Sequence, residues 1–358
     1  MQVVVLAGGI GSRLWPLTSS LPKPLLPVLN RPLLVHLLER FKLFGVDEAM
    51  LAVHYRSEQI EAYFKENPID GLEISCPREP KPLGTAGAVK NVAHKLQSTF
   101  LVGNGDIFTD LDIGKAIAFH RANKAEVTIV LAQVANPSLY GMVETMASDR
   151  ILRFVEKPKS DEITTNWVNA GTYIMEPSAI EAIPDDRFFM FEKDLFPLLL
   201  RNRVRVYGFK SGAYWLDMGT HNTYLQLHED LLSRRPGPVL PEINSIAPSA
   251  ELLGPVLIGP GTIISDLVRV VGPTSIGQEC RIGVKTLVRR SVVLDHVIIG
   301  ERVEIEQSII GRGVRIGDDV RVPAGCCLGD GVIVRQGTDL PMGLNVDPGS
   351  EIGSELHD

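Results

Sequence analysis

The feature that most constrains this chain is a six-residue repeat in its last third. Apolar side chains recur there every six residues, with two steps of five, and a glycine often follows the apolar position. Such a period is typical of a parallel β-helix, in which each hexad forms one short strand and three hexads complete a coil. One side chain per hexad then points inward, and glycine turns the corner with little steric cost. The apolar positions are Ile276, Ile282, Val288, Leu294, Ile299, Ile305, Ile310, Ile316, Val322, Leu328 and Val334.

The distribution of aromatic residues supports the β-helix. The chain contains 12 Phe, 7 Tyr and 3 Trp, and none of them lies after Tyr224. A narrow core of stacked coils favours small and β-branched side chains, which explains the missing rings. A β-sandwich, the alternative, would show strict alternation along longer strands.

A proline-rich segment separates the repeat from the rest of the chain. Residues 233–241 read Ser-Arg-Arg-Pro-Gly-Pro-Val-Leu-Pro, a run that neither a continuous helix nor a central strand accommodates. We therefore expect a first domain over residues 1–232, a linker over 233–241, a β-helix over 242–345 and a C-terminal tail over 346–358.

The first domain alternates strand-like and helix-like segments. Repeated strand–helix units predict an α/β fold with a Rossmann-like, mostly parallel sheet and helices on both faces. Ligands of such sheets lie beyond the carboxyl ends of the strands. The predicted strands are 3–6, 49–53, 72–75, 99–102 and 127–131, and the predicted helices are 33–44, 57–64, 84–96 and 113–122.

Charge and hydropathy argue against several classes of partner. The formal net charge is −7, with 36 Lys and Arg against 43 Asp and Glu, so we expect no general binding to nucleic acid or to anionic membranes. No apolar run approaches the ~20 residues that span a bilayer. The four cysteines show no zinc spacing, and the first residues lack a signal-peptide pattern. These features predict a cytoplasmic protein with reduced thiols.

A glycine-rich segment follows the first predicted strand. It reads Leu-Ala-Gly-Gly-Ile-Gly-Ser-Arg-Leu over residues 6–14, and Lys23 follows between two prolines. Glycines let backbone amides approach a phosphate, and a guanidinium such as that of Arg13 suits phosphate oxygens. Leu14 occupies the third glycine position of the dinucleotide fingerprint, and no Walker sequence follows. The segment therefore predicts nucleotide binding outside both of these patterns.

Residues 6–32 resemble the signature of the sugar-nucleotide pyrophosphorylases, a family of nucleotidyltransferases, with Ser12 in place of the usual threonine. The resemblance continues, in family order, at residues 82–88, 104–106, 156–158, 169–171 and 215–220. It implies a nucleotide-diphospho-sugar transferase type of fold over residues 1–232. It also implies that the hexapeptide repeats form a left-handed β-helix, which some family members carry.

The resemblance implies a reaction and a set of roles. A sugar 1-phosphate attacks the α-phosphorus of a nucleoside triphosphate directly and pyrophosphate leaves, so the protein positions the reactants and offsets their charge. Arg13 and Lys23 match the residues that hold the triphosphate, and Lys157 matches the lysine that holds the sugar phosphate. Asp106 and Asp217 match the carboxylates that bind Mg²⁺, the expected cofactor. Asp110 and Asp112 are expected to cap a helix.

Substrate contacts are likewise implied by the resemblance. Glu79 aligns with the glutamine of uridine- and thymidine-specific members, and because a carboxylate only accepts hydrogen bonds it favours guanine, which offers two adjacent donors. The other interpretation of Glu79 is a solvated surface residue. The expected sugar contacts are Gly141, Glu156, Lys157 and Asn169. The expected nucleotide contacts are Leu6, Ala7, Gly8, Gly9, Gly11, Ser12, Arg13, Lys23, Glu79, Gly84, Thr85 and Asp106.

Several functions stay open at this point. The overall resemblance favours mannose-1-phosphate guanylyltransferases, with glucose-1-phosphate thymidylyl- and uridylyltransferases as the alternative and a heptose or cyclitol phosphate also open. A hexapeptide acyltransferase would need a catalytic histidine between coils, whereas His296 is expected in a loop. A non-catalytic paralogue, such as a subunit of a translation initiation factor, shares the two-domain plan. We expect small-molecule substrates, and a homo-oligomer formed through the β-helix.

Overall fold

The computed structural model describes residues 1–9, 11–53, 56–79, 81–235, 237–240 and 245–353. The chain divides into two compact units, one of Met1–Gly9 and Leu34–Asp217 and the other of Ile10–Leu33 and Met218–Asp358. Residues 236 and 241 of the expected linker, 242–244 at the start of the expected β-helix, and 354–358 of the expected tail lie outside the described residues. The division at residue 232 stays a prediction.

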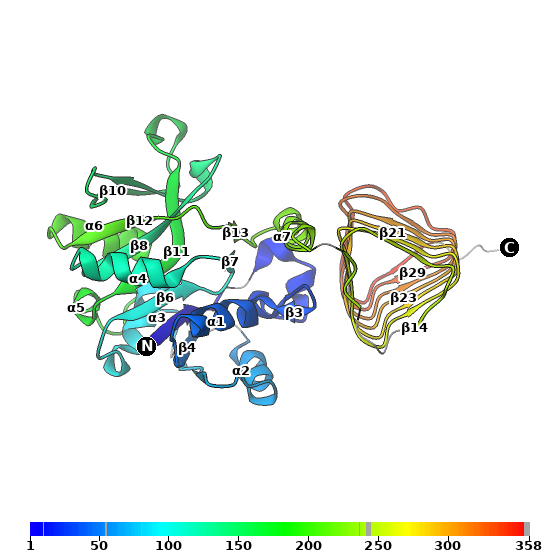
Figure 1. The fold of residues 1–358 in the computed structure, drawn as a ribbon, viewed down its shortest axis with the longest axis horizontal. Helices are drawn as coiled ribbons and strands as arrows, with labels where there is room; N and C mark the ends of the chain where they lie inside the picture. The colour runs from blue at the N-terminus through cyan, green and yellow to red at the C-terminus, as the bar shows by residue number, and fades with distance from the viewer. Residues whose placement is uncertain (10, 54–55, 80, 236, 241–244, 354–358) are drawn as a thin grey trace. The chain divides into compact units, whose positions relative to one another are not determined.

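A nine-stranded sheet forms the centre of the first unit, with β10-β9-β11-β6-β1-β4-β5 in order, β8 joined to β11 and β12 joined to β8 (Figure 1). Its strands are β1 (Gln2–Leu6), β4 (Glu48–Ala52), β5 (Glu73–Ser75), β6 (Phe100–Asn104), β8 (Val127–Gln133), β9 (Gly141–Thr145), β10 (Ile151–Glu156), β11 (Trp167–Met175) and β12 (Val206–Lys210). The helices of this unit are α1 (Leu33–Leu43), α2 (Ser57–Glu66), α3 (Gly84–Asn91), α4 (Ile113–Ala122), α5 (Pro177–Ile180) and α6 (Phe196–Arg201), with shorter turns at η4 (Ala93–Lys95), η5 (Pro137–Leu139), η6 (Ser160–Glu162) and the π-helical η7 (Phe191–Leu195).

The predicted α/β fold is confirmed, with an antiparallel half that the pattern did not show. Strands β5, β4, β1 and β6 are parallel, as strand–helix units require. Beyond β6 the direction reverses, because β11 runs antiparallel to β6, β8 and β9. The carboxyl ends of β1, β4 and β6 therefore share one edge of the sheet.

Helices cover both faces of this sheet. Successive side chains of a strand point to opposite faces. In β6, Phe100 and Val102 join a buried cluster with Val89 of α3 and Phe196 of α6. On the opposite face, a Cβ on Gly103 would lie 2.7 Å from the ring of Phe41 in α1. The sheet is thus enclosed between α3 and α6 on one side and α1 on the other.

The second unit contains the predicted parallel β-helix, which in Figure 1 is a three-sided prism. One side stacks β14 (Ser245–Ile246), β17 (Ile263–Ile264), β20 (Arg281–Ile282), β23 (Ile298–Ile299), β26 (Arg315–Ile316), β29 (Ile333–Val334) and β31 (Glu351–Ile352). The second stacks β15 (Glu251–Leu253), β18 (Arg269–Val271), β21 (Leu287–Arg289), β24 (Glu304–Glu306) and β27 (Arg321–Val322). The third stacks β16 (Val256–Ile258), β19 (Thr274–Ile276), β22 (Val292–Val293), β25 (Ile309–Ile310), β28 (Cys327–Leu328) and β30 (Asn345–Val346). Strand β31 lies in the segment expected to be the tail.

The hexapeptide interpretation holds with one shift of position. Every predicted apolar position is buried, but Val293 rather than Leu294 pairs with Ile276 and Ile310. The first five-residue step therefore lies before Val293 and not after Leu294. Glycine is needed at the corners because the coils approach closely: a Cβ on Gly283 would lie 2.4 Å from a backbone oxygen of the next coil.

Two segments from outside the repeat pack on the β-helix within this unit. Helix α7 (His221–Ser233) places His228 Nδ1 2.9 Å from Ser275 Oγ. The segment Ile10–Leu33 donates from Trp15 Nε1 to Asp347 Oδ1 at 2.7 Å and from Asn30 Nδ2 to Ile276 O at 2.8 Å. This segment contains η1 (Ser12–Leu14), η2 (Leu17–Ser19), η3 (Lys23–Leu25), β2 (Pro27–Val28) and β3 (Arg31–Pro32).

All four cysteines are free thiols. Cys280, Cys326 and Cys327 are buried, and burial raises the pKa of Cys280 to about 12. They serve as small core residues. Among the described residues, no helix is both long and apolar enough to cross a membrane.

Candidate functional site

The glycine-rich segment leaves the first unit's sheet at the shared carboxyl edge. Ala7 N donates to Ala52 O of β4 at 3.0 Å, and Gly105 N donates to Leu6 O at 2.8 Å. A Cβ on Gly105 would lie 3.1 Å from Leu6 O, so this approach needs glycine. The start of the expected nucleotide loop, Leu6 to Gly9, therefore lies beside the turn that carries Asp106.

The two expected metal ligands are brought together by a small ribbon. Strand β7 (Ile107–Thr109) pairs antiparallel with β13 (Trp215–Asp217), and Asp217 is the partner of Ile107. Asp106 and Asp217 thus lie at the same end of the ribbon although 111 positions separate them. Two carboxylates suit Mg²⁺, which binds through one or two of them and keeps waters and phosphate oxygens. No cluster of three or more metal-binding side chains occurs in the described part of the chain, in keeping with such a sparse donor set.

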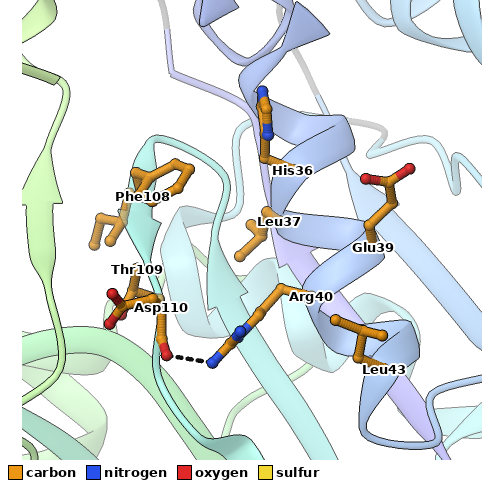
Figure 2. Close-up of a pocket in the computed structure, with 9 residues that line it drawn as sticks. His36, Leu37, Glu39, Arg40, Leu43, Phe108, Thr109 and Asp110 are labelled. Atoms are coloured by element: carbon orange, nitrogen blue, oxygen red, sulfur yellow. Dashed lines mark hydrogen bonds between the residues drawn. The ribbon is translucent and has the colours of Figure 1, made fainter. Parts of the chain in front are cut away.

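The other end of the ribbon is fastened to helix α1, as Figure 2 shows. Arg40 donates from Nε to Leu111 O at 2.9 Å and from Nη2 to Asp110 O. Asp110 Oδ1 accepts from Tyr214 N at 2.7 Å, so the expectation that Asp110 caps a helix is wrong. Asp112 does cap α4, accepting from Lys115 N at 3.0 Å.

The expected sugar-binding residues converge on β9, β10 and β11. Gly141 of β9 pairs with Glu156 of β10, and a Cβ on Gly141 would lie 3.0 Å from Glu156 Oε2. Lys157 follows in a left-handed conformation (φ 49°) with its N–H bonded to Tyr140 O at 3.0 Å. Such strain in a residue other than glycine is frequent at functional sites. Asn169 of β11 donates to Tyr173 Oη at 2.9 Å.

Burial shapes the electrostatics of this region. Burial raises the pKa of Glu156, and the charges of Lys157 and Lys193 partly offset that rise. The buried phenol of Tyr173 has its pKa raised by burial and further by three carboxylates, those of Glu192, Glu156 and Asp106. The regions expected to bind the sugar and the metal therefore both present carboxylates near one buried tyrosine.

Glu192 belongs to this group, although the sequence pattern did not single it out. It lies in η7, a π-helical turn, and its Oε2 accepts from Thr85 Oγ1 at 3.3 Å. Thr85 Oγ1 in turn accepts from Phe191 N at 2.9 Å. Burial, and then the charge of Glu156, raise the pKa of Glu192. The one signal in the sequence is a charged run, Glu-Lys-Asp, inside an apolar stretch, and π-turns of this kind are frequent at functional sites.

The expected nucleotide residues Gly84 and Thr85 begin helix α3 and contact residues 189–192. Gly84 has φ +75°, and a Cβ there would lie 2.7 Å from Phe189 O. Ala86 N also donates to Phe189 O at 3.0 Å. Glu79 Oε2 accepts from Leu83 N at 3.2 Å, so its carboxylate orders the loop before α3.

The remaining expected nucleotide residues lie in the second unit. Gly11 has φ 69°, and a Cβ there would lie 2.9 Å from Thr18 Cγ2 and 3.1 Å from Lys23 Cβ. Ser12 and Arg13 are exposed in η1, whereas Lys23 is buried at 6% exposure. Gly11 and Lys23 are therefore neighbours in one compact loop.

His296 lies at a corner of the β-helix. Its φ is 60°, its side chain is 53% exposed, and Nδ1 lies 3.2 Å from Glu279 Oε2. It is a turn residue, as expected, and the described structure pairs it with a surface carboxylate.

Comparisons with known proteins agree with this architecture. Residues 2–234 match the family model described as nucleotidyl transferase, and residues 242–340 match the model of the EIF2B subunit epsilon LbH domain. The chain is 36% identical to a mannose-1-phosphate guanylyltransferase of Mycobacterium tuberculosis over 312 residues, 86% of this chain and 83% of the relative. It is 34% identical to a UTP–glucose-1-phosphate uridylyltransferase of Synechocystis sp., over 89% of this chain and 86% of the relative.

Among solved structures, the chain resembles HddC from Yersinia pseudotuberculosis complexed with GMP-PN. The TM-score is 0.56 and the identity 30%, with 64% of this chain and 99% of that chain covered.

Proposed function

The chain belongs to the nucleotidyl transferase family, as its motifs predicted, and from that premise we propose that it joins GTP to mannose 1-phosphate with release of pyrophosphate. The observation that supports the reaction class is the β7–β13 ribbon, which holds Asp106 and Asp217 together near the glycine-rich loop. The choice of substrates rests on the mannose-1-phosphate guanylyltransferase relative and on the HddC structure, which holds GMP-PN.

Each proposed role follows from a charge or a hydrogen-bonding group. Arg13 and Lys23 hold the triphosphate and the leaving pyrophosphate, and Lys157 holds the attacking sugar phosphate. Mg²⁺ on Asp106 and Asp217, when bound, would neutralise developing charge on the phosphates. The residues of the chain position two anions for direct attack, so no protein nucleophile is required.

The sugar hydroxyls are proposed to bind between β9 and β11. The Glu156 carboxylate accepts from sugar hydroxyls beside Gly141, where the Phe154 ring and Glu156 Oε2 would lie 2.5 and 3.0 Å from an added Cβ. Asn169 both donates and accepts, and its amide is held by Tyr173 and by Gly171 N, which donates to Oδ1 at 2.9 Å. Glu79 accepts from the two adjacent donors of guanine in this proposal.

Uridylyl transfer to glucose 1-phosphate is the second candidate, because a glucose-1-phosphate uridylyltransferase is 34% identical over 89% of the chain. A matrix of pyrophosphate-release assays decides between them, with four NTPs and dTTP against mannose 1-phosphate and glucose 1-phosphate in the presence of Mg²⁺. The highest kcat/KM is expected for GTP with mannose 1-phosphate. A preference for UTP or dTTP would overturn the base assignment, and no release with any pair would overturn the reaction class.

Assembly and location are proposed as well. We propose a homo-oligomer formed through the β-helix and a cytoplasmic location. One side of the β-helix supports assembly, since Ile263, Ile298 and Ile333, each about 40% exposed, alternate with the exposed Arg281 and Arg315 in one stacked column. Light scattering of the purified chain tests the oligomer, and a strict monomer would contradict it.

A further inference from the structure

The β7–β13 ribbon is too small to hold itself in place. It contains three residue pairs, and it is not joined to the nine-stranded sheet. A two-stranded pairing of this kind is marginally stable alone. Nevertheless, it carries Asp106 and Asp217 at one end, and metal ligands need to be held to within a fraction of an ångström. Other contacts must therefore fix the ribbon.

Those contacts gather at the opposite end, around the backbone of Tyr214. Its N–H donates to Asp110 Oδ1 at 2.7 Å. Its carbonyl accepts from Thr109 Oγ1 at 2.8 Å and from Asp110 N at 3.2 Å. The side chains and backbone of residues 109 and 110 thus bind both polar backbone atoms of Tyr214 and extend the pairing of β7 with β13 by one residue.

Arg40 connects this end to a rigid helix. Its guanidinium donates to two consecutive carbonyls, to Leu111 O at 2.7 and 2.9 Å and to Asp110 O (Figure 2). The helix that carries it, α1, is anchored by Leu38 and Phe41, both fully buried. A planar guanidinium presents several donors in a fixed geometry, which a lysine ammonium does not reproduce.

We propose that Arg40 and Asp110 are positioning residues for the divalent metal. They hold β7 against β13 from the end opposite the ligands, and so set the separation of Asp106 and Asp217. This inference rests on the proposed function, because it takes these two carboxylates as the metal ligands. The glycine-rich loop starts from β1 and not from the ribbon, so nucleotide contacts outside the metal keep their geometry when the ribbon loosens.

The test measures metal binding to the whole chain apart from turnover. Mn²⁺ is the probe, and its free concentration is read by electron paramagnetic resonance with a non-hydrolysable GTP analogue present. Asp110→Ala and Arg40→Met are expected to weaken Mn²⁺ binding about tenfold, the low end for loss of groups that orient metal ligands. Asp110→Asn keeps an oxygen acceptor for Tyr214 N and is expected to restore most of the affinity.

Asp112→Ala is the matched control, since Asp112 caps α4 two residues away and has no described hydrogen bond to either strand of the ribbon, although the charge of Arg40 is among the causes that lower the pKa of its carboxyl. It is expected to bind Mn²⁺ like the wild type. Thr109→Val replaces Asp110→Ala in the test if Asp110→Ala does not fold. It removes the hydrogen bond from Thr109 to Tyr214 O and is expected to weaken Mn²⁺ binding a few fold.

The experiment distinguishes failure of the positioning role from failure of the metal assignment. If Asp106→Asn abolishes Mn²⁺ binding while Arg40→Met and Asp110→Ala leave it unchanged, the positioning role is wrong and the metal site stands. If Asp106→Asn binds Mn²⁺ like the wild type, the metal assignment of the proposed function is itself wrong. Equal weakening by Asp112→Ala and Asp110→Ala would also overturn the inference, because it would indicate general loss of structure.

Discussion

The β7–β13 ribbon and the β-helix are both built from strands of two or three residues, and they solve the problem of short strands differently. A strand inside the β-helix pairs with a coil on each side, so each pairing supports the next. The ribbon has one pairing and depends on single side chains, such as those of Arg40, Thr109, Asp110 and Trp215. Repetition stabilises one region, and individual contacts stabilise the other.

The two regions also differ in what they bury. Most buried polar side chains described in the second unit carry hydroxyl groups; His228 and Lys23 are the exceptions. The hydroxyl side chains are Thr18 and, in the β-helix, Thr262, Thr274, Ser275, Thr286, Ser291 and Ser308. The buried polar side chains described in the first unit are three hydroxyls and His120, but this unit also has the half-buried carboxylates Glu156 and Glu192, whose pKa values burial raises. Because a partly buried charge costs free energy, it is retained where chemistry uses it. The comparison predicts that substitutions in the first unit change activity and that substitutions in the β-helix change stability.

The largest expected effect is that of Asp106→Asn. Loss of one of two metal carboxylates should lower kcat on the order of a thousandfold, since bound Mg²⁺ supplies several kcal/mol of charge stabilisation and about 1.4 kcal/mol corresponds to tenfold. Steady-state pyrophosphate release measures it, and Asp112→Asn is the control. Near-normal turnover of Asp106→Asn would contradict the prediction that substitutions in the first unit change activity.

A smaller but substantial effect is expected on stability from Ile299→Ala in the β-helix. Ile299 is 2% exposed and points into the coil, so its truncation leaves a cavity and should cost about 2–5 kcal/mol. Ile298, the neighbour in the same strand, is 42% exposed, and at protein concentrations where the proposed oligomer dissociates Ile298→Ala should stay within about 0.5 kcal/mol. Urea denaturation followed by circular dichroism measures both. Equal costs would show that the strand does not distinguish its two faces.

The sequence predicted most of the β-helix because each coil repeats the same local pattern. A period of six and a glycine at the corner are visible without any knowledge of distant pairing. The exception is the placement of the five-residue step, since Val293 and Leu294 are both apolar and only the pairing with Ile276 selects Val293. In the first unit the five predicted strands and four predicted helices are also present, with α4 found at the predicted 113–122, whereas β7, β9–β13, α5 and α6 were not predicted.

What the sequence did not predict are contacts between distant residues that have no period. The reversal at β11 depends on which strand it meets, and local pattern carries no information on that. Glu192 joins Thr85 across 107 positions through a π-turn, and Asp110 bonds Tyr214 across 104. Family motifs supplied Asp106 and Asp217 as a pair, whereas the residues that support them lie outside those motifs.

Gly283→Ala should cost about 1–3 kcal/mol through overpacking, because the added Cβ would meet backbone oxygen and carbon of Gly300 at 2.4 and 2.5 Å. Gly212, in a loop of the first unit, has nothing within 4 Å of such a Cβ, and Gly212→Ala should be close to neutral. Thermal unfolding compares the two variants. At temperatures where Gly283→Ala is folded, its KM values should match the wild type; altered KM values would mean that the repeat takes part in substrate binding.

The smallest expected effect concerns pH and the enclosed carboxylates of the first unit. Glu156 accepts hydrogen bonds from sugar hydroxyls most strongly while ionised, and burial raises its pKa. The KM for the sugar 1-phosphate should therefore rise on acidification at a higher pH than the usual glutamate pKa of about 4.3 would allow. Lys193 lowers the pKa of both Glu156 and Glu192, and it holds no proposed substrate contact. In Lys193→Met, the rise of KM on acidification should therefore begin at a still higher pH, while kcat at neutral pH stays unchanged. KM measured across pH 4.5 to 8 with saturating NTP shows the shift, with Lys159→Met as the control. If the pH dependence of KM is the same in Lys193→Met as in the wild type, solvent screens Lys193 from the site. The charges of Glu156 and Glu192 would then be balanced by Lys157 alone.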